Sequence, residues 1–227
     1  MIIDPYSWQT VRILEVHRES RHAVSLRITR PNNYHFMIGQ HAAIRVNLPG
    51  GTSVLRQYSF ASATSADDIW LTIVKTPGGL VSSWLVDEAC IGDNLAISQP
   101  FTGPLCQPDI LLSAPLCLIA GGSGIAPLMS ILRERRLHGR FDTTLIYSTR
   151  TDERCFESEL QPQHEESIII RDTTTTARLS NEDILTIHAQ TSYTFICGSK
   201  QFVTTMRTYC DNSAPTSYIF SEAFSLI

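Results

Sequence analysis

Residues 118–128 read Leu118-Ile119-Ala120-Gly121-Gly122-Ser123-Gly124-Ile125-Ala126-Pro127-Leu128, an apolar run that enters a glycine-dense turn and continues into a helix. Glycines remove Cβ atoms where a backbone turns sharply near a ligand, and free amides at a helix start point at an anion. Pro127 suits the first helical position, where a missing amide costs nothing, and Gly139 should end the helix. The stretch predicts a phosphate-binding turn, although a tight structural turn gives the same residues.

The first half of the chain contains short runs of alternating polar and apolar residues. These runs cover residues 11–16, 22–28, 43–48, 56–61, 69–75 and 94–98. Short strands separated by turn residues are typical of closed antiparallel sheets. We therefore expect a six-stranded antiparallel β-barrel.

From residue 114 onward, short buried strands alternate with helical segments. The strands are expected at residues 116–120, 144–147, 167–170, 194–197 and 217–220. This alternation predicts an α/β fold with a five-stranded parallel sheet. Ser180 and Asp183 form a capping box at one helix start, and Ser199 caps the next helix. We place the domains at 1–110 and 111–227, joined by the proline-rich stretch 100–115.

Composition narrows the class of protein. The 227 residues are 43% hydrophobic and 18% charged, with a net charge of −4, which argues against a nucleic-acid partner. Residues 1–5 lack the basic start of a signal peptide, and no apolar run is long enough to span a membrane. We expect a cytoplasmic protein with no membrane partner.

The six cysteines are dispersed along the chain without close pairs. Iron-sulfur clusters and structural zinc sites need ligands a few residues apart, so no metal site is expected. An even number of cysteines also allows disulfides, but a chain of this length without a secretory signal favours free thiols.

Three further motifs accompany the glycine turn. They are Arg56-Gln57-Tyr58-Ser59, Gly79-Leu80-Val81-Ser82 and Cys197-Gly198. In this order the motifs resemble the ferredoxin-NADP reductase superfamily over nearly the whole chain. The resemblance implies a stand-alone reductase without a ferredoxin domain, in which the barrel binds FAD and the parallel sheet binds a nicotinamide dinucleotide.

The barrel motif has a chemistry of its own. Arg56 offers a guanidinium for a pyrophosphate, Tyr58 an aromatic face for a flat ring, and Ser59 a hydroxyl for a ring nitrogen. Without the other motifs, these three residues could equally belong to an ordinary strand that binds no ligand, with the arginine exposed, the tyrosine in the core and the serine in a turn. The resemblance implies FAD, with the tyrosine stacked on the isoalloxazine and the serine near N5. The predicted flavin residues are Arg56, Gln57, Tyr58, Ser59, Ile73, Val74, Lys75, Gly79, Val81 and Ser82.

The second half should bind the hydride donor. The resemblance places Cys197 beside the nicotinamide C4, although a small buried residue at a strand end fits Cys197 equally well. Arginines after the second and third strands favour NADPH, whereas Asp152 leaves NADH possible. Here the predicted residues are Gly122, Ser123, Gly124, Ser148, Arg150, Arg171, Arg178, Cys197, Gly198 and, near the flavin, Phe224. The resemblance implies a catalytic set of Ser59, Cys197 and Glu222.

These features predict an FAD-dependent NAD(P)H oxidoreductase that passes electrons to a separate ferredoxin-like or flavodoxin-like protein, or to an oxygenase component. Two alternatives remain open, namely a flavin reductase that uses free flavin as substrate and a flavin-binding electron-transfer subunit of a larger complex. His41 departs from the family pattern, which usually has an aromatic residue at that position. The basic cluster Arg133, Arg135, Arg136 and Arg140 is expected to form a solvated helix face.

Overall fold

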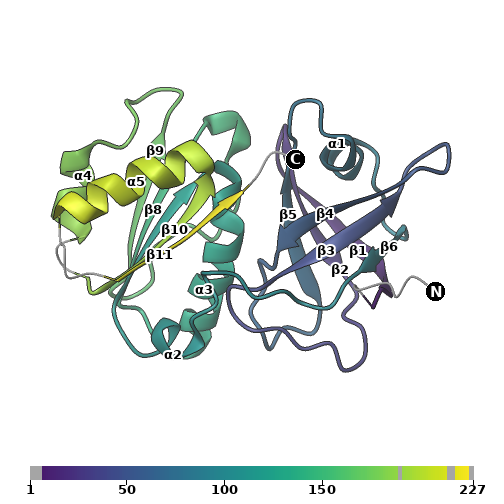
Figure 1. The fold of residues 1–227 in the computed structure, drawn as a ribbon, viewed down its shortest axis with the longest axis horizontal. Coiled ribbons are helices and arrows are strands. Elements are labelled where there is room, and N and C mark those ends of the chain that lie inside the picture. Colours follow the sequence, from purple (N-terminus) through teal and green to yellow (C-terminus); the bar gives the residue numbers. More distant parts are fainter. Residues whose placement is uncertain (1–6, 189–190, 214–217, 225–227) are drawn as a thin grey trace.

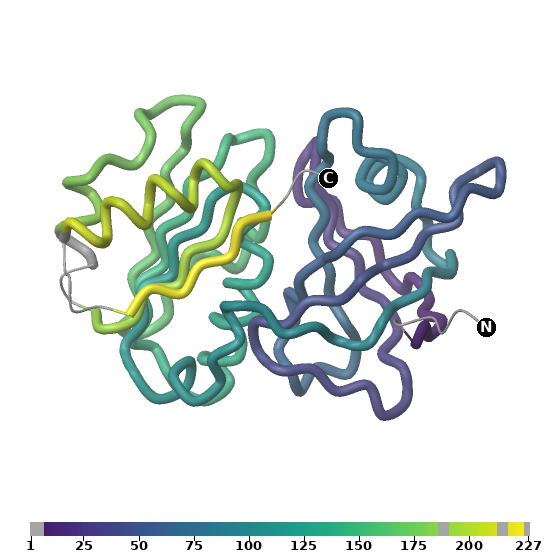
Figure 2. The backbone as a smooth tube through the Cα atoms, in the orientation of Figure 1, coloured from purple at the N-terminus to yellow at the C-terminus, as the bar shows by residue number. Residues whose placement is uncertain are grey.

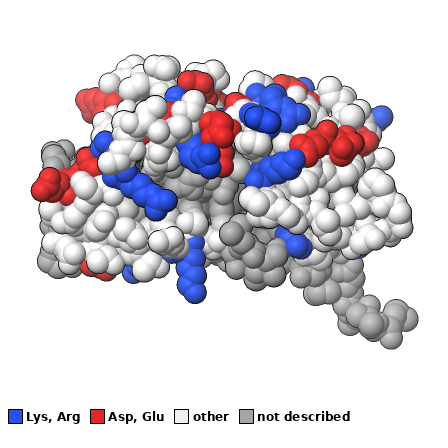
Figure 3. All heavy atoms as spheres, turned by 90° about the horizontal axis from the view of Figure 1, so that it is seen from above, with Lys and Arg blue, Asp and Glu red and all other residues white. Residues whose placement is uncertain are grey.

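The computed structural model describes residues 7–188, 191–213 and 218–224. A barrel formed by the first part of the chain lies beside a parallel sheet formed by the second (Figure 1). The segment between residues 98 and 115 connects the two, and the last strand returns toward the barrel (Figure 2). Positive and negative side chains are interspersed over both halves on the face seen in Figure 3.

Six antiparallel strands form the barrel, in the order β4-β3-β6-β1-β2-β5. Phe60, directly after β4, forms an antiparallel bridge with Leu71 of β5, and the Ala61 amide donates to the Trp70 carbonyl at 2.8 Å. These contacts close the sheet, which confirms the predicted barrel. The strands are β1 (Gln9–Ser20), β2 (Ala23–Ile28), β3 (His41–Asn47), β4 (Ser53–Ser59), β5 (Ile69–Val74) and β6 (Asn94–Ile97), with helix α1 (Leu80–Asp87) after β5.

The second sheet is parallel throughout, in the order β11-β10-β7-β8-β9. From β7 the chain builds outward through β8 and β9, and then returns to place β10 on the other side of β7. The topological switch point therefore lies between β7 and β10. The strands are β7 (Leu116–Gly121), β8 (Thr143–Thr149), β9 (Ser167–Asp172), β10 (Tyr193–Ser199) and β11 (Tyr218–Phe224). This arrangement confirms the predicted five-stranded α/β fold.

Helices cover both faces of the parallel sheet. Helix α3 (Ile125–Leu137) packs on the face that carries Leu118 and Phe195, between the sheet and the barrel. Helices α4 (Asn181–His188) and α5 (Lys200–Ser213) pack on the face that carries Ile119 and Ile196. Among the described residues, no helix combines the length and the apolar character that crossing a membrane requires.

The helix starts follow the sequence closely, with one correction. The Ser180 hydroxyl accepts from the Asp183 amide at 3.2 Å, and the Asp183 carboxylate accepts from the Ser180 amide at 2.9 Å, as a capping box requires. The Ser199 hydroxyl caps α5. Pro127, however, is the third residue of α3, because the glycine turn forms a short 3₁₀ helix, η1 (Gly122–Gly124), that runs directly into α3.

Two connections differ from the expected pattern. Between β8 and β9 the structure has only a 3₁₀ turn, η2 (Thr151–Glu153), in place of an α-helix. Cys155, Phe156 and Leu160 of the following loop are buried and cover the sheet there as a helix would. The proline-rich connection contains helix α2 (Pro108–Leu111), whose Leu111 is fully buried, so it packs against the fold. The boundary at residue 110 stays a prediction.

The arginine cluster in and after α3 is paired with carboxylates, and only Arg135 of its four members is fully buried, so the expectation of a solvated helix face is wrong. The side chain of Arg135 is fully buried and donates to Asp142 at 2.7 Å and to the Leu111 carbonyl. Loops that carry carboxylates and carbonyls fold over this face of the helix and provide partners for its cations. The remaining ion pairs are Arg133 with Glu159, Arg136 with Glu166, and Arg140 with Asp142.

Helix α3 also binds the barrel through the loop that follows Ser59. The Ser130 hydroxyl donates to the Ser62 carbonyl at 2.7 Å, and the Arg133 guanidinium donates to the Ala61 carbonyl at 2.6 Å. The Glu134 carboxylate accepts from the amide and hydroxyl of Thr64. The glycine turn at the start of α3 and the loop after β4 are therefore held in a fixed relation.

Candidate functional site

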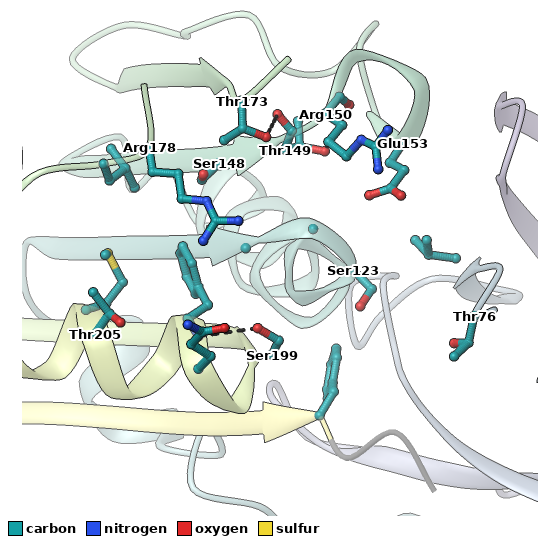
Figure 4. Close-up of a pocket in the computed structure, with 18 of the residues that line it drawn as sticks. Thr76, Ser123, Ser148, Thr149, Arg150, Glu153, Thr173, Arg178, Ser199 and Thr205 are labelled. Atoms are coloured by element: carbon teal, nitrogen blue, oxygen red, sulfur yellow. Dashed lines mark hydrogen bonds between the residues drawn. The ribbon is translucent and has the colours of Figure 1, made fainter. Parts of the chain in front are cut away.

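A cleft of about 610 Å³ lies at the carboxyl edge of the parallel sheet and faces the barrel (Figure 4). Its floor is the topological switch point between β7 and β10, where open α/β sheets bind ligands. Residues 74–77, at the end of β5 and directly after it, form its barrel side. Of the predicted binding residues, those that line this cleft are Val74, Lys75, Gly122, Ser123, Ser148, Arg150, Arg178 and Phe224.

The glycines around the turn serve three different purposes. A Cβ on Gly124 would lie 2.2 Å from the Cys197 carbonyl oxygen, so this glycine allows α3 to approach β10. Cβ atoms on Gly121 and Gly198 would collide with the ring of Phe202. Gly122 has a φ of +52° and nothing within 4 Å of its missing Cβ. Only Gly122 of these four is open toward a ligand.

Polar side chains line the cleft at the ends of β8 and β9. Ser148 and Arg150 come from the end of β8, Thr173 follows β9, and Arg178 extends its guanidinium into the cleft (Figure 4). Arg150 lies 3.4 Å from the Asp152 carboxylate, and both side chains are exposed. This group suits the ribose and phosphate of a dinucleotide.

Arg171 does not join that group, contrary to prediction. Its guanidinium donates to the Asp183 carboxylate at 2.7 Å, and it does not line the cleft. Arg171 of β9 lies opposite Ser148 of β8 in the sheet. The ion pair with Asp183, however, directs the Arg171 side chain toward the capping box of α4. Arg171 therefore stabilises the start of α4, and the assignment of Arg171 to a 2′-phosphate is corrected.

The predicted flavin residues lie on strands β4 and β5 and at the start of α1. Arg56 and Gln57 are exposed on β4, and the Arg56 guanidinium contacts the Leu55 carbonyl at 2.7 Å. Burial raises the pKa of Tyr58, against the smaller effect of the Arg56 charge. Ile73 and Val81 are buried in the barrel core, which leaves only their backbone groups for a ligand.

The start of α1 offers an anion site. Gly79 is the N-cap residue and provides no side-chain hydrogen bond to the first turn. The Ser82 hydroxyl accepts from the Thr76 amide at 3.1 Å and donates to the Gly79 carbonyl, so the hydroxyl has its partners within the loop. The first-turn amides, without a side-chain cap, suit a pyrophosphate.

Two of the predicted catalytic residues are neighbours in the parallel sheet, and none of the three is among the residues that line the cleft. Cys197 of β10 and Glu222 of β11 are register partners in the parallel sheet. Burial, and then the charge of Glu222, raises the pKa of the fully buried Cys197 thiol. Burial also raises the pKa of Glu222. Ser59 pairs with His41 across β3 and β4, and His41 Nδ1 lies 3.7 Å from Glu222 Oε1. His41 thus connects the strand of Ser59 to Glu222.

Sequence reasoning missed the wall of the cleft that α5 forms. This wall consists of Gln201, Phe202, Thr205, Met206 and Tyr209, and Glu153 and Thr149 also line the cleft. The signal was present in the sequence, because these α5 residues recur every three or four positions directly after Cys197-Gly198. A prediction that placed this helix at the switch point would have assigned these α5 residues to the site.

The residues present fit both expected groups. The cleft is large enough for part of a dinucleotide, its turn is open at Gly122, and Arg150 and Arg178 line it. The first turn of α1 and the ring of Tyr58 provide an anion site and an aromatic surface on the barrel. In the described part of the chain, no three metal-ligating side chains cluster.

Comparison with known proteins agrees with this geometry. A family model described as oxidoreductase FAD-binding domain matches residues 10–105. The toluate 1,2-dioxygenase electron transfer component of Pseudomonas putida is 32% identical over 142 residues, which cover 62% of this chain and 40% of that protein. The ferredoxin–NADP reductase of Pseudomonas aeruginosa is 29% identical over 161 residues, covering 69% and 62% respectively.

The fold is also shared with solved structures. A ferredoxin NADP⁺ reductase from Neisseria gonorrhoeae, with bound FAD and NADP, superimposes with a TM-score of 0.80 at 21% identity and covers 95% of this chain and 98% of that one. The fold and the matched domain define a two-domain protein in which an oxidoreductase FAD-binding barrel precedes a parallel α/β sheet. Residues 10–105 match the oxidoreductase FAD-binding domain, and the chain is similar in sequence and in fold to ferredoxin–NADP reductases. It spans between 34% and 62% of the length of the curated relatives it matches.

Proposed function

We propose that this chain is an FAD-dependent NAD(P)H oxidoreductase that passes electrons to a separate acceptor, either a ferredoxin-like or flavodoxin-like protein or an oxygenase component. The observation that carries the proposal is the contact between the two halves at which Glu222, the register partner of Cys197, lies 3.7 Å from His41, the register partner of Ser59. The name of the Pseudomonas putida relative, an electron transfer component of a dioxygenase, supports an oxygenase partner. A cytoplasmic location remains a prediction from the sequence.

Each half of the chain has its own task in this proposal. The first turn of α1 and Arg56 bind the FAD pyrophosphate, and Tyr58 covers the flat ring. Gly122 and Ser123 bind the dinucleotide phosphates, and Arg150 and Arg178 bind its adenosine end. The domains of this proposal are residues 1–110 and 111–227.

The protein contributes orientation and polarity. FAD, when bound, would supply a hydride acceptor that can release electrons one at a time. Cys197 would limit the position of a bound nicotinamide relative to the flavin. The hydrogen bonds from α3 to the loop after β4 fix the distance between the two binding sites. Orientation of this kind contributes several kcal/mol to a hydride transfer, roughly 7 to 11 in well-aligned cases.

An absorption spectrum of the purified protein, followed by anaerobic titration with NADPH and with NADH, tests the proposal. We expect bound FAD, released on denaturation, and its bleaching by NADPH at lower concentration than by NADH. A colourless protein that turns over added riboflavin would contradict the proposal and favour the flavin-reductase alternative. Bound flavin that neither nucleotide reduces would favour the electron-transfer subunit.

Stopped-flow reduction of two cysteine variants tests the hydride step. Cys197→Ala should retain flavin but slow its reduction, because a small misplacement of the reacting carbons costs rate. Cys90→Ala is the control, since Cys90 is exposed and does not line the cleft. Equal reduction rates for Cys197→Ala and the parent would show that Cys197 only fills the end of β10.

A further inference from the structure

A series of hydrogen bonds runs from the barrel to the connection between β8 and β9. The Glu19 carboxylate of β1 accepts from the Phe156 backbone amide at 2.7 Å and from the Ser25 hydroxyl at 2.6 Å. The Ser25 hydroxyl lies 2.8 Å from that of Thr72. Because the single proton of Ser25 goes to Glu19, Thr72 is the donor in this second bond. Ser25 and Thr72 are buried, so the series is anchored inside the barrel.

The local sequence of β1 explains why the Glu19 side chain leaves the regular face of its strand. The register of β1 against β2 shifts between Arg18 and Ser20, so Glu19 lies in a bulge. A bulge redirects a side chain from the ordinary alternation of a strand. The carboxylate reaches a residue 137 positions further along the chain, and Glu19 therefore links the two halves.

The backbone of Phe156 is held in a conformation that its own side chain disfavours. Its φ is +62°, in the left-handed region that bulky residues rarely adopt. The Arg133 guanidinium lies 5.1 Å from the centre of the buried Phe156 ring, and the Tyr147 hydroxyl accepts from the Cys155 amide at 3.3 Å. Burial, and then the charge of Glu19, raises the pKa of the Cys155 thiol to about 12. The conformation of this loop thus depends on groups outside it.

The two ends of the series lie next to opposite sides of the cleft. Thr72 belongs to β5, and residues 74–77 at the end of that strand form the barrel side. Phe156 lies three residues after Glu153, which lines the cleft from the parallel-sheet half (Figure 4). Glu19 therefore joins the strand behind one side to the loop behind the other.

We propose that Glu19 is a positioning residue that sets the width of the cleft, and with it the affinity for the nicotinamide dinucleotide. The inference rests on the proposed function. With the carboxylate in place, the β8–β9 connection is held in its binding position before the ligand arrives, which avoids the cost of ordering it on binding. Without the carboxylate, the connection occupies that position for only part of the time, and the affinity falls by that fraction.

The contact itself is tested by hydrogen exchange of the Phe156 amide, followed by NMR in the purified protein without added nucleotide. In Glu19→Ala this amide should exchange at least about tenfold faster than in the parent, because its acceptor is gone. In Glu19→Gln it should exchange at about the parent rate. The Gln carbonyl accepts from Phe156 and the Gln amide donates to Ser25, whose hydroxyl then donates to Thr72.

Glu15→Ala is the matched control for the exchange measurement. Glu15 is also a carboxylate of β1, but it pairs with Arg27 of the barrel at 3.1 Å. Its removal should leave the exchange of the Phe156 amide unchanged.

Parent-like exchange in a folded Glu19→Ala variant overturns the contact. If that variant does not fold, Ser25→Ala decides, because it removes the hydroxyl that holds the carboxylate and leaves Glu19 in the chain. Faster exchange of the Phe156 amide in Ser25→Ala supports the contact, and an unchanged rate overturns it.

The role in the cleft has its own readout in the binding of NADP⁺, measured by calorimetric titration. If the connection occupies its binding position about a tenth of the time in Glu19→Ala, the dissociation constant for NADP⁺ rises about tenfold. We expect this rise in Glu19→Ala, parent values in Glu19→Gln and Glu15→Ala, and the same flavin spectrum in all four proteins.

Faster exchange with an unchanged dissociation constant in Glu19→Ala would overturn the positioning role, because the contact would then only stabilise the loop. A parent protein that binds neither NADP⁺ nor NAD⁺ overturns the proposed function and the positioning role together. The exchange rates still decide the contact in that case, so the two failures are distinguishable.

Discussion

Gly124→Ala tests how closely the anion turn must approach the strand that carries Cys197. The added methyl would lie 2.2 Å from the Cys197 carbonyl oxygen and 2.6 Å from the Gly198 nitrogen, whereas ordinary contacts begin at 3.4 Å. The clash is with backbone on both sides, so α3 and β10 must separate by about 1 Å. Overpacking of this kind costs about 1 to 3 kcal/mol of the free energy of unfolding. We expect the upper half of that range, measured by urea denaturation.

The same separation should reach the chemistry. A displacement of about 1 Å at a reacting centre can slow a reaction by roughly a hundredfold. Because Cys197 and Gly198 move with the end of β10, Gly124→Ala should slow flavin reduction in stopped-flow measurements while the flavin stays bound to the barrel.

Gly139→Ala is the matched control. Gly139 lies two residues after the end of α3, has a φ of +65°, and has nothing within 4 Å of its missing Cβ. The methyl there should cost only the strain of a left-handed alanine, about 1 to 2 kcal/mol, and leave flavin reduction unchanged. Equal reduction rates in Gly124→Ala and Gly139→Ala would refute the argument that the close approach of α3 to β10 positions the reacting groups.

Two further predictions concern charged residues near the cleft. Arg178→Ala should weaken the binding of NADPH by about 1 to 3 kcal/mol and leave that of NADH unchanged, because Arg178 lines the cleft. Arg171→Ala should leave NADPH binding unchanged and lower the free energy of unfolding, because Arg171 pairs with Asp183. Titration of both variants with each nucleotide tests this, and a selective loss of NADPH binding in Arg171→Ala would contradict it. The backbone hydrogen bond from Ser180 holds the pKa of Asp183 below its ordinary value. The ionised Asp183 carboxylate therefore stabilises the folded protein at a pH above the pKa that this group has in the unfolded chain. This contribution is lost as the pH falls through the pKa that the group has in the folded protein. The free energy difference between Asp183→Asn and the parent should therefore shrink from pH 7 to pH 3 in urea denaturation, and a constant difference would count against the capping box as its source.

The strands could be predicted because each one carries its own pattern. The alternation of the barrel strands and the short apolar runs of the parallel strands reflect which face is buried, and that information is local in sequence. The capping box of Ser180 and Asp183 is local as well, since its partners are three residues apart.

What sequence reasoning missed depends on contacts between distant segments. The arginines of α3 are charged residues on a helix, and only the loops that fold over them provide their carboxylate partners and bury Arg135. Arg171 follows a strand at the correct edge of the sheet, but its ion pair with Asp183 is a property of the folded chain. The β8–β9 connection is buried through Cys155, Phe156 and Leu160, which give no helical period.

The glycine turn shows why a motif can identify a family while leaving the chemistry of its residues open. Three of the glycines around the switch point are required by the protein itself, since Gly124 admits the Cys197 carbonyl, and Gly121 and Gly198 admit Phe202. These positions would need glycine whether or not a ligand bound there. The information about the ligand lies in Gly122, whose left-handed backbone faces open space, and in Ser123, which points into the cleft. A sequence in which only the three packing glycines were present would thus fold in the same way and still lack the anion site.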